Sequence, residues 1–563
     1  IDLEDREVFK LFGDGNTVGV FQFESSGMRE NLKKLKPKRI EDLIAMNALY
    51  RPGPMQMIDE FIECSHGRRR VTYHHPDLEP ILEETYGVIV YQEQVIRIAT
   101  DLAGFSLGKA DNLRWAITKK RHAMMKSLQE DFVEGCISRG IDRKTAETIY
   151  LACEQFAYYG FAKAHSAGYA MIAYQCAYLK VHHSADYLAA CLTVRRRNTN
   201  QVMKLLSECR SLGIPVSAPD VNTSEYGFVA SDGGIRFGLA AVKNVGDAAV
   251  NAILEARAQY GPFTSLHHFL TSVDLRAVKK NIIESLIDAG AFDGIGPNRA
   301  TMHASLPSAV MYAQAINDER LRKQATLFGQ FGVDPAVHIP PPEYHHVAEW
   351  PPEELRSREK KVLGVYLSSH PLDAFTSEID GLTSHKLTDK EDFKDAMRLR
   401  TAGVITSVRF RNTKRGDRMA VVVLEDLTGS IECLVFQQAL QNSTHLLETD
   451  RLVGMSGRIS RHENDEEPKL WVDEIISLEN ALEKWGRSVR IRIDEHQVTE
   501  PLLIRLEQVF ESNPGNAPIY IDLTYPNGDI RTYRVGRFTV KPSPEMVRRL
   551  GEIVGEGRVQ VRR

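Results

Sequence analysis

Residues 401–436 read TAGVITSVRFRNTKRGDRMAVVVLEDLTGSIECLVF and decide the fold of the second half of the chain. Alternating or continuous apolar runs of strand length are separated by turn signals, Arg-Gly-Asp at 415–417 and Thr-Gly at 428–429. The run RLVGMSGRIS at 451–460 continues the pattern. About five short strands in about eighty residues are typical of a small closed barrel. We therefore predict an OB-fold barrel over residues 396–480.

Upstream of this stretch the sequence changes to helical spacing. Residues 1–225 have few alternating runs, and long stretches such as 99–125 and 166–194 carry apolar residues at helical intervals. Residues 226–295 begin with a strand-like piece and continue as short helices punctuated by glycine. Residues 296–350 are expected to be rich in loops and to end in a proline-rich linker.

Downstream of the barrel, residues 487–563 read as a last α+β module. Strands are expected near 488–493, 518–523 and 531–540, followed by a helix that begins at Pro544. The chain of 563 residues is too long for one core, and at roughly 100–200 residues per domain we expect three to five domains.

Composition narrows the class of protein. Hydrophobic residues make up 43% and charged residues 26%, a balance that excludes a largely disordered chain. No apolar run approaches about 18 residues and no secretory leader is present, so we expect no membrane span and no export. The seven cysteines are scattered without a CxxC pair, which indicates the reducing cytoplasm and no zinc site. The chain opens with Ile1, and we expect an upstream segment.

The net charge of −4 conceals local clusters of basic residues. Residues 29–39 (RENLKKLKPKR) and 109–126 (KADNLRWAITKKRHAMMK) are strongly basic, and residues 195–197 are three consecutive arginines. Discrete basic stretches in a nearly neutral protein suit a polyanion bound along one face. For any one stretch, a solvated helix face remains the alternative.

The stretch YYGFAKAHSAGY at 158–169 is the first candidate binding site. Lys163 and His165 lie between a loop that contains Gly160 and a helix expected to begin near Ser166. Free backbone N–H groups at a helix start, with Lys and His beside them, can hold a phosphate. A capped helix with an ordinary exposed lysine would read the same way.

Cations at two other places could join this site. In the group Arg114, Lys119, Lys120 and Arg121, helical spacing brings Arg114 and Lys120 or Arg121 near one face, giving several cations for a polyphosphate or a DNA backbone. Arg51 precedes a Pro-Gly-Pro turn that could hold it in a fixed direction, although such a turn also simply ends a helix.

Residues 239–257 (LAAVKNVGDAAVNAILEAR) have the pattern of a helix–hairpin–helix. Such hairpins bind DNA phosphates through backbone amides without reading sequence, so Lys243, Asn244, Val245 and Gly246 are candidate DNA contacts. Asn244 stands where a glycine is usual, and asparagine tolerates the left-handed conformation. A helical hairpin without a ligand is the alternative.

The segment QATLF at 324–328 lies between a polar helix and the proline-rich linker. An exposed Gln324 followed by the apolar pair Leu327 and Phe328 suits a short peptide that fills a pocket of a partner protein. Five-residue patterns also arise by chance.

The chain lacks the usual signatures of a self-sufficient catalytic site. Two-metal polymerases and nucleases need converging carboxylates, commonly an Asp-x-Asp pair, and none occurs here. Walker A, HExxH and GxSxG motifs are also absent, and we predict no metal site in this chain.

Taken in order, these segments resemble the C-terminal part of the bacterial DNA polymerase III alpha (catalytic) subunit family. The matching segments span most of the chain: VFQFESSGM (20–28), ALYRPGPMQ (48–56), YGVIVYQEQVIRIA (86–99), ADNLRWAITKK (110–120), YYGFAKAHSAGYA (158–170), LIDAGAFD (286–293), QATLF (324–328) and LGVYLSSHPL (363–372).

The resemblance implies a multidomain α+β protein with a mostly helical N-terminal half, a tandem helix–hairpin–helix, an OB-fold barrel and a small C-terminal α+β domain. The implied assignments are fingers at 1–225, tandem helix–hairpin–helix at 226–295, clamp-binding segment and linker at 296–395, OB-fold at 396–480, and clamp-loader-binding domain at 485–563.

The resemblance also implies roles for the candidate residues. Arg51, Arg114, Lys119, Lys120, Lys163 and His165 become contacts to dNTP or DNA phosphates, and Gln324, Leu327 and Phe328 match the clamp-binding peptide. The catalytic aspartates and Mg²⁺ of the family belong to the palm, upstream of Ile1. The OB barrel would receive single-stranded template through the candidates Phe410, Phe436, Arg409, Arg411, Lys414 and Arg415, unless it serves only as a spacer.

The expected activity of the full subunit is template-directed primer extension in the bacterial cytoplasm, and its nucleoid association would follow replication. Its partners would be primer–template DNA, dNTPs, the sliding clamp, the clamp-loader subunit and other holoenzyme subunits. The first alternative is a non-enzymatic scaffold that binds DNA and tethers the clamp. The second is an RNA-handling protein whose OB and helical modules bind tRNA.

Overall fold

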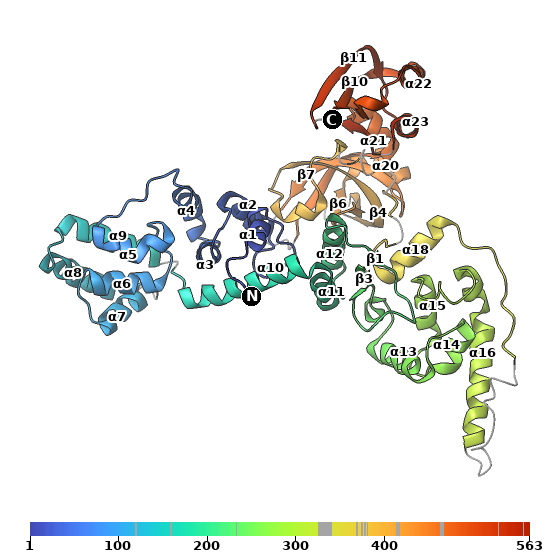
Figure 1. Ribbon diagram of the computed structural model, residues 1–563, viewed down its shortest axis with the longest axis horizontal. Helices are drawn as coiled ribbons and strands as arrows, with labels where there is room; N and C mark the ends of the chain where they lie inside the picture. Colours follow the sequence, from blue (N-terminus) through green and yellow to red (C-terminus); the bar gives the residue numbers. More distant parts are fainter. Residues whose placement is uncertain are drawn as a thin grey trace. The chain divides into compact units, whose positions relative to one another are not determined.

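The computed structural model contains two compact units, Ile1–Leu188 and Ala189–Arg563 (Figure 1). It describes the following residues: 1–118, 121–157, 160–231, 233–324, 340–367, 370–372, 375, 379, 381–412, 417–461, 467–526, 528–555 and 557–562.

The first unit is helical in its described part, as the sequence predicts. Its α-helices are α1 (Arg6–Gly13), α2 (Ser26–Leu35), α3 (Ile40–Leu49), α4 (Ile58–Ser65), α5 (Glu79–Leu82), α6 (Gln92–Asp101), α7 (Leu107–Thr118), α8 (His122–Ser138), α9 (Arg143–Ala157) and α10 (Lys163–His182). Short 3₁₀ turns lie at η1 (Pro54–Met57), η2 (Pro76–Leu78) and η3 (Glu83–Thr85), and α11 (Ser184–Arg195) continues into the second unit.

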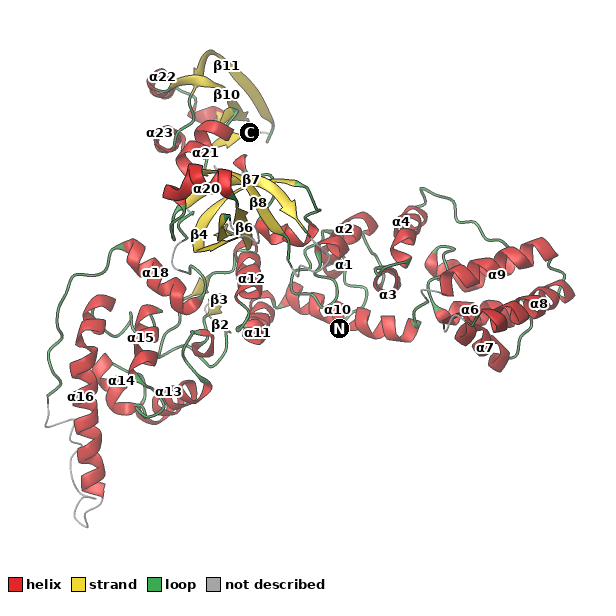
Figure 2. Ribbon diagram, turned by 180° about the vertical axis from the view of Figure 1, so that it is seen from behind, coloured by secondary structure: helices red, strands yellow, loops and turns green. Residues whose placement is uncertain are grey.

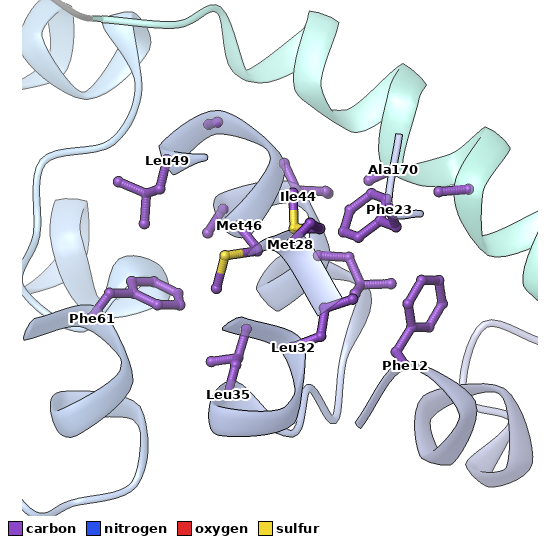
Figure 3. Close-up of a cluster of buried hydrophobic side chains, with 14 of the residues drawn as sticks. Phe12, Phe23, Met28, Leu32, Leu35, Ile44, Met46, Leu49, Phe61 and Ala170 are labelled. Atoms are coloured by element: carbon purple, nitrogen blue, oxygen red, sulfur yellow. The ribbon is translucent and has the colours of Figure 1, made fainter. Parts of the chain in front are cut away.

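One core of this unit is enclosed by α1 to α4 and α10 (Figure 3). Met28, Leu32 and Leu35 recur at intervals of four and three, so one face of α2 is buried and its lysines lie on the other face. Helix α10 is fixed against α3 by the buried Ser166, whose hydroxyl donates to the Ile44 carbonyl at 2.7 Å. A second core is built from α5 to α9.

The run predicted to be helical over 99–125 is broken twice. Helix α6 ends at Asp101, Gly104 adopts φ +67°, and α7 and α8 begin as separate helices. The turn passes so close to α8 that a Cβ at Gly135 would lie 2.1 Å from the Ala103 carbonyl oxygen. The apolar periodicity continues across these breaks because all three helices face the same core.

The second unit begins with helices and a small sheet. Helix α12 (Thr199–Ser211) precedes β1 (Val216–Ser217), β2 (Val229–Ser231) and β3 (Gly234–Arg236), which form a sheet in the order β1-β3-β2. The tandem helix–hairpin–helix follows: η4 (Leu239–Ala241), α13 (Asp247–Tyr260), α14 (Leu266–Ser272) and α15 (Lys280–Asp288).

The prediction that residues 296–350 are rich in loops is wrong for their first half. Helix α16 (Arg299–Gln324) is 26 residues long and continues through Pro307. Met302, Leu306 and Ala309 are buried at intervals of four and three, so burial of one face stabilises the helix despite the proline. Helix α18 (Pro352–Leu363) then leads to the barrel.

The predicted five-stranded barrel is confirmed. Its strands are β4 (Arg398–Asn412), β5 (Arg418–Glu425), β6 (Ser430–Val435), β7 (Leu452–Ser460) and β8 (Lys469–Ser477), closed in the order β4-β5-β6-β8-β7. Alternate residues, such as Val422 and Leu424 of β5, point into the core. The short η7 (Leu387–Asp392), α20 (Gln437–Ser443) and η8 (Thr444–Leu446) pack against the strands (Figure 2).

The predicted C-terminal α+β module is also confirmed. Its sheet has the order β11-β10-β9-β12, from β9 (Ser488–Asp494), β10 (Pro514–Thr524), β11 (Ile530–Val540) and β12 (Val559–Arg562). The helical elements are α21 (Leu478–Trp485), η9 (Glu495–Gln497), α22 (Glu500–Ser512) and α23 (Pro544–Val554).

Within the described ranges, no helix has both the length and the apolar character needed to cross a membrane.

Candidate nucleotide and nucleic-acid interface

The first candidate site forms where the starts of α6 and α10 meet in the first unit. Tyr91 and Phe161 form a parallel bridge, in which the Gln92 amide donates to the Phe161 carbonyl at 3.0 Å. The Gln92 side chain donates to the Gly160 carbonyl at 2.9 Å. The loop before α10 is therefore fastened to the first residue of α6. Helix α10 begins at Lys163, three residues earlier than predicted.

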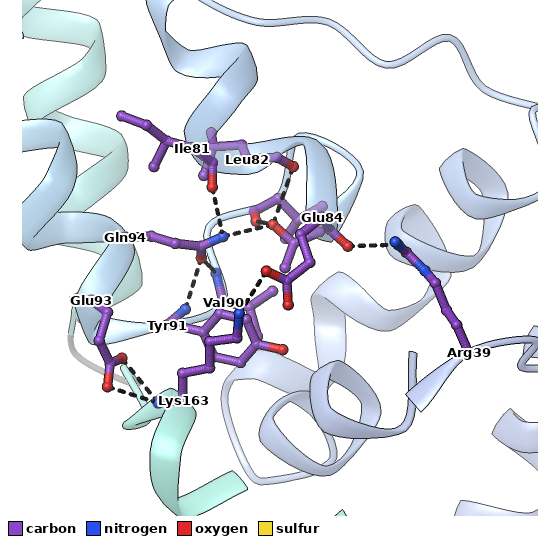
Figure 4. Close-up of polar contacts among 11 residues, drawn as sticks. Arg39, Ile81, Leu82, Glu84, Val90, Tyr91, Glu93, Gln94 and Lys163 are labelled. Carbon is purple, nitrogen blue, oxygen red and sulfur yellow. Dashed lines mark hydrogen bonds and ion pairs between the residues drawn. The ribbon is translucent and has the colours of Figure 1, made fainter. Parts of the chain in front are cut away.

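Two acidic side chains accept hydrogen bonds from the backbone amide and the ammonium group of Lys163 at the start of α10 (Figure 4). Both carboxylate oxygens of Glu93 accept from the Lys163 amide, at 3.1 and 2.9 Å. The Lys163 ammonium donates to Glu84 Oε2 at 2.6 Å. Anions are favoured at a helix start and beside an ammonium, so Glu84 and Glu93 stand where a phosphate would bind.

A buried tyrosine lies next to this ion pair. The Lys163 ammonium is 5.7 Å from the ring centroid of Tyr91. The Tyr91 hydroxyl and Glu84 Oε1 are buried without a hydrogen-bond partner in the described part of the chain. Burial, with a smaller contribution from the Glu84 carboxylate, raises the pKa of Tyr91, so its hydroxyl stays protonated at neutral pH.

Arg51 approaches the same loop from the opposite side. Its guanidinium lies 4.2 Å from the ring centroid of Phe161, and its Nε donates to the Ala48 carbonyl at 3.0 Å. Burial lowers the pKa of Arg51, but arginine remains charged at neutral pH. Gly53, two residues later, has φ +104°, a conformation that favours glycine in this turn.

Arg114 and His165 complete the cluster. Arg114 Nη1 donates to Gln92 Oε1 at 3.2 Å, and its Nε donates to Asp111 at 2.8 Å. The exposed ring of His165 lies between those of Phe161 and Tyr169, with centroids 5.1 and 4.6 Å away. Gln92 thus contacts Arg114, and Phe161 contacts Arg51 and His165, close to Lys163 at the start of α10.

The sequence did not single out the residues that organise this cluster. Gln92, Phe161, Glu84 and Glu93 were given no role, although residues 86–99 and 158–170 carried part of the resemblance. The available signal was three polar residues in succession, Gln-Glu-Gln at 92–94, directly after an apolar run. Gln94 shows that this signal is useful. Its buried side chain accepts from the Tyr91 amide at 2.9 Å and caps the start of α6.

The first helix–hairpin–helix has the predicted backbone conformation at Asn244, with φ +68°. Its side chain donates to the Ser285 hydroxyl of α15 at 3.1 Å. The amides of Lys243 and Val245 are already used, donating to the carbonyls of Val362 and Val242. In the described part of the chain, the amides of Asn244 and Gly246 have no acceptor, so these two are open to a phosphate.

Two arginines of the predicted basic triplet lie beside this hairpin. Arg196, Arg197 and Lys243 line a cavity of about 240 Å³ that also includes Phe228 and Phe237. Arg197 lies 4.0 Å from Asp247, which begins α13. The second unit thus gathers three cations around a small cavity next to the hairpin.

A row of outward-facing side chains crosses the barrel. The strand register places Arg409, Val421, Leu434, Trp471 and Arg458 side by side across β4, β5, β6, β8 and β7. Trp471 is 46% exposed. Cations therefore flank an apolar and aromatic centre, the arrangement that single-stranded nucleic acid uses for stacking and phosphate contacts.

The predicted aromatic residues of the barrel lie near this row. Phe436 is in edge contact with Trp471, with centroids 5.5 Å apart. Phe410 is exposed at the end of β4, next to Arg411, and carries the Arg418 guanidinium 4.5 Å from its ring centroid. Trp471 and Arg458 were not predicted, because only the pairing of distant strands places them in this row.

Several predicted residues lie outside the described residues: Lys119, Lys120, Leu327, Phe328, Lys414 and Arg415. Gln324 is the last residue of α16, and Arg121 directly precedes α8.

If Glu93 caps α10, the substitution Glu93→Ala should loosen the start of that helix. Loss of a capping acceptor costs about 1 kcal/mol, which corresponds to about fivefold faster hydrogen exchange of the Lys163 amide. Asp101→Ala, which removes the same charge at the other end of α6, is the matched control and should leave this exchange unchanged. An unaltered rate in Glu93→Ala would contradict the capping role.

Comparison with known protein families gives three matches. Residues 1–140 match the bacterial DNA polymerase III alpha subunit finger domain, residues 213–302 the helix-hairpin-helix motif, and residues 399–478 the OB-fold nucleic acid binding domain. The matched ranges agree with the helical unit, the tandem hairpins and the barrel.

Full-length proteins that resemble the chain include DNA polymerase III alpha subunits from several bacteria. DNA polymerase III subunit alpha of Vibrio cholerae is 37% identical over 570 residues, which cover 100% of this chain and 49% of that protein. The subunits of Pseudomonas aeruginosa and Escherichia coli K12 are 37% and 36% identical, and the alignments cover 99% and 100% of this chain. The chain spans about half the length of these curated relatives. Over its whole length the chain is therefore similar to about half of a bacterial DNA polymerase III alpha subunit, and its first 140 residues match the finger domain of that family.

Proposed function

We propose that this chain forms the part of a replicative DNA polymerase that extends from the fingers to the C-terminal domain. The observation that carries the proposal is the gathering of Lys163, Arg51, Arg114 and His165 around the joined starts of α6 and α10. Arg51 and Arg114 lie within the range that matches the finger domain, and Lys163 and His165 follow it. In the full subunit it would hold the triphosphate of the incoming nucleotide during primer extension.

The proposed binding step is an exchange of anions. Lys163 leaves the Glu84 carboxylate and pairs with a phosphate, while Arg51 and Arg114 neutralise further phosphate oxygens. Gln92 keeps the loop and Arg114 in register during this exchange, because its side chain holds both. Positioned cations of this kind stabilise the charge that develops on the leaving pyrophosphate.

Nucleotidyl transfer by such polymerases uses Mg²⁺ to activate the primer 3′-hydroxyl and to stabilise the leaving group. The described residues contain no group of three or more side chains suited to hold a metal ion. We propose that carboxylates of the half of the subunit that this chain does not span hold Mg²⁺.

The second unit is proposed to grip DNA. The open amides of Asn244 and Gly246, with Lys243 and the neighbouring arginines, would contact duplex phosphates without reading sequence. The barrel row around Trp471 would receive single-stranded template. We assign residues 226–295 and 396–480 to these roles, and residues 1–225 to the fingers.

The remaining segments are proposed to bind proteins. Residues 296–395 would tether the sliding clamp through Gln324, Leu327 and Phe328, and residues 485–563 would bind the clamp-loader subunit. This proposal rests on the sequence resemblance. Such a subunit would act in the bacterial cytoplasm with the other subunits of the replicase.

The triphosphate site can be tested in the full-length subunit by primer extension. Lys163→Ala should raise the KM for dNTPs about 10- to 100-fold, because a hydrogen bond to a charged group contributes about 1.5–3 kcal/mol. Glu84→Gln should lower the KM, since Lys163 then has no competing carboxylate. Lys144→Ala, on the exposed face of α9, is the control. Unchanged KM and turnover in Lys163→Ala would remove this residue from the site, and absence of primer extension by the unaltered subunit would favour the scaffold.

The barrel row can be tested by binding of single-stranded DNA to the purified chain. Trp471→Ala should weaken binding about 5- to 100-fold, because stacking of a base contributes about 1–3 kcal/mol. Ile530→Ala, which removes another exposed apolar side chain in β11, should have no effect. Equal affinities for the Trp471 variant and the original chain would show that the barrel is a spacer.

Clamp tethering can be tested by surface plasmon resonance against the sliding clamp. The double variant Leu327→Ala/Phe328→Ala should abolish binding, because the apolar anchors of a short peptide supply most of its affinity. DNA binding should be intact in the same variant. Unchanged clamp affinity would refute the assignment of QATLF.

A further inference from the structure

A basic cavity of about 440 Å³ lies between α2 and α4 in the first unit, and the proposed triphosphate site does not use it. Four lysines from the end of α2 and its connection to α3 line one side, and Arg68 and His66, just after α4, line the other. The lining includes two carboxylates, Asp59 and Glu63. The full set of charged and histidine lining residues is Lys33, Lys34, Lys36, Lys38, Asp59, Glu63, His66 and Arg68.

The lysines are held in place by their stems and backbone. A Cβ at Gly15 would lie 2.8 Å from the Lys33 side chain, and a Cβ at Gly13 would lie 3.6 Å from Lys36, so both lysines pack over glycines at the α1–α2 turn. His66 Nε2 is 2.8 Å from the Lys34 carbonyl oxygen and joins the two walls. The positive groups are therefore organised before any ligand arrives.

Three of these lysines lack an internal counter-charge. Lys33 pairs with Glu30 at 2.7 Å, and Arg68 pairs with Glu63 at 2.9 Å. In the described part of the chain, no carboxylate oxygen lies within 4.0 Å of the ammonium groups of Lys34, Lys36 and Lys38, although the Lys38 amide donates to Asp42. We call these three residues the lysine ridge. Lys36 also adopts φ +47°, a conformation that costs a lysine about 1–2 kcal/mol.

The ridge separates two cavities. Lys36 and Lys38 also line a cavity of about 700 Å³ on the other side, together with Arg6, Lys10 and Arg39. Three acidic residues, Glu4, Asp14 and Glu41, share this second cavity, so cations exceed acids in both. Positive charge on both sides of a ridge fits an extended polyanion better than a single phosphate group.

The second cavity continues toward the triphosphate site. Arg39 Nη2 donates to the Glu84 carbonyl at 2.8 Å, and the carboxylate of the same Glu84 holds Lys163 (Figure 4). A polyanion that runs along the ridge into the second cavity would therefore lie beside Arg39, which contacts the residue that pairs with Lys163.

We propose that the lysine ridge binds the phosphate backbone of a nucleic-acid strand that passes beside the triphosphate site. Lys34, Lys36 and Lys38 each neutralise a phosphate, and Arg68 and Arg39 mark the two sides of the path. This inference rests on the proposed function, because it extends the DNA path of the same unit.

The test is DNA binding by the purified chain across a salt series. Lys34→Gln/Lys36→Gln/Lys38→Gln should weaken binding about 10- to 100-fold at low salt and reduce the slope of log affinity against log salt by about 2 to 3, since each phosphate contact contributes about 0.9. The control variant is Lys144→Gln/Lys361→Gln/Lys394→Gln, which removes three exposed lysines elsewhere and should bind nearly as the original chain does. Single-stranded and duplex oligonucleotides are compared, and the one with the larger loss identifies the bound strand.

The outcomes separate the two proposals. No DNA binding by the original chain, shown to be folded by circular dichroism, would overturn the DNA-binding function and the ridge together. Binding by the original chain with equal affinity and slope in the ridge variant would overturn only the ridge, and would leave an acidic protein as the ligand of this surface. Equal losses in the ridge and control variants would also overturn it, because they would reflect net charge alone.

Discussion

The hydrogen bonds of Gln92 are the constraint on which the first unit's candidate site depends. They join a loop at Gly160 and Phe161 to the start of α6, across about seventy residues of sequence, and they hold the Arg114 guanidinium at the same point. Without this junction the start of α10 would not face Glu84, and Arg51 would have no Phe161 ring to rest against. One amide side chain therefore helps to set the positions of basic residues that come from two helices, α7 and α10, and from the turn after α3.

The proposed triphosphate site at the start of α10 and the lysine ridge differ in how their positive charges are balanced. At the start of α10, the Glu84 carboxylate pairs with the Lys163 ammonium, and the Glu93 carboxylate accepts from the Lys163 amide. Both contacts stabilise the unliganded state. At the ridge, no carboxylate of the described residues forms an ion pair with the ammonium groups of the three lysines, and cations outnumber carboxylates around both cavities, so like charges repel one another. Such repulsion lowers stability, and a protein tolerates it where a ligand supplies the missing charge.

The sequence predicted what depends on local pattern. The barrel strands followed from alternation and turn signals, and a helix after residue 162 followed from its apolar spacing, although α10 begins three residues earlier than predicted. Helix α16 was missed because Pro307 and the polar residues around it hid a buried stripe that includes Met302 and Leu306. Trp471 and Gln92 were missed for another reason. Their partners lie on distant strands or loops, and no local spacing specifies which strands will pair.

The difference in charge balance between the triphosphate site and the lysine ridge implies that the two bind phosphates in different ways. A cation that already pairs with a carboxylate gains little when it exchanges that anion for a phosphate, because one ion pair replaces another and Glu84 is left uncompensated. Lys163 would therefore contribute less net affinity than an unpaired lysine does, although its removal would leave the Glu84 carboxylate unpaired beside the triphosphate and so raise the KM. An unpaired lysine releases a condensed counterion from the nucleic acid without losing an internal partner, so it contributes affinity directly. The ridge would hold the strand, and the site at α10 would respond to a correctly placed triphosphate.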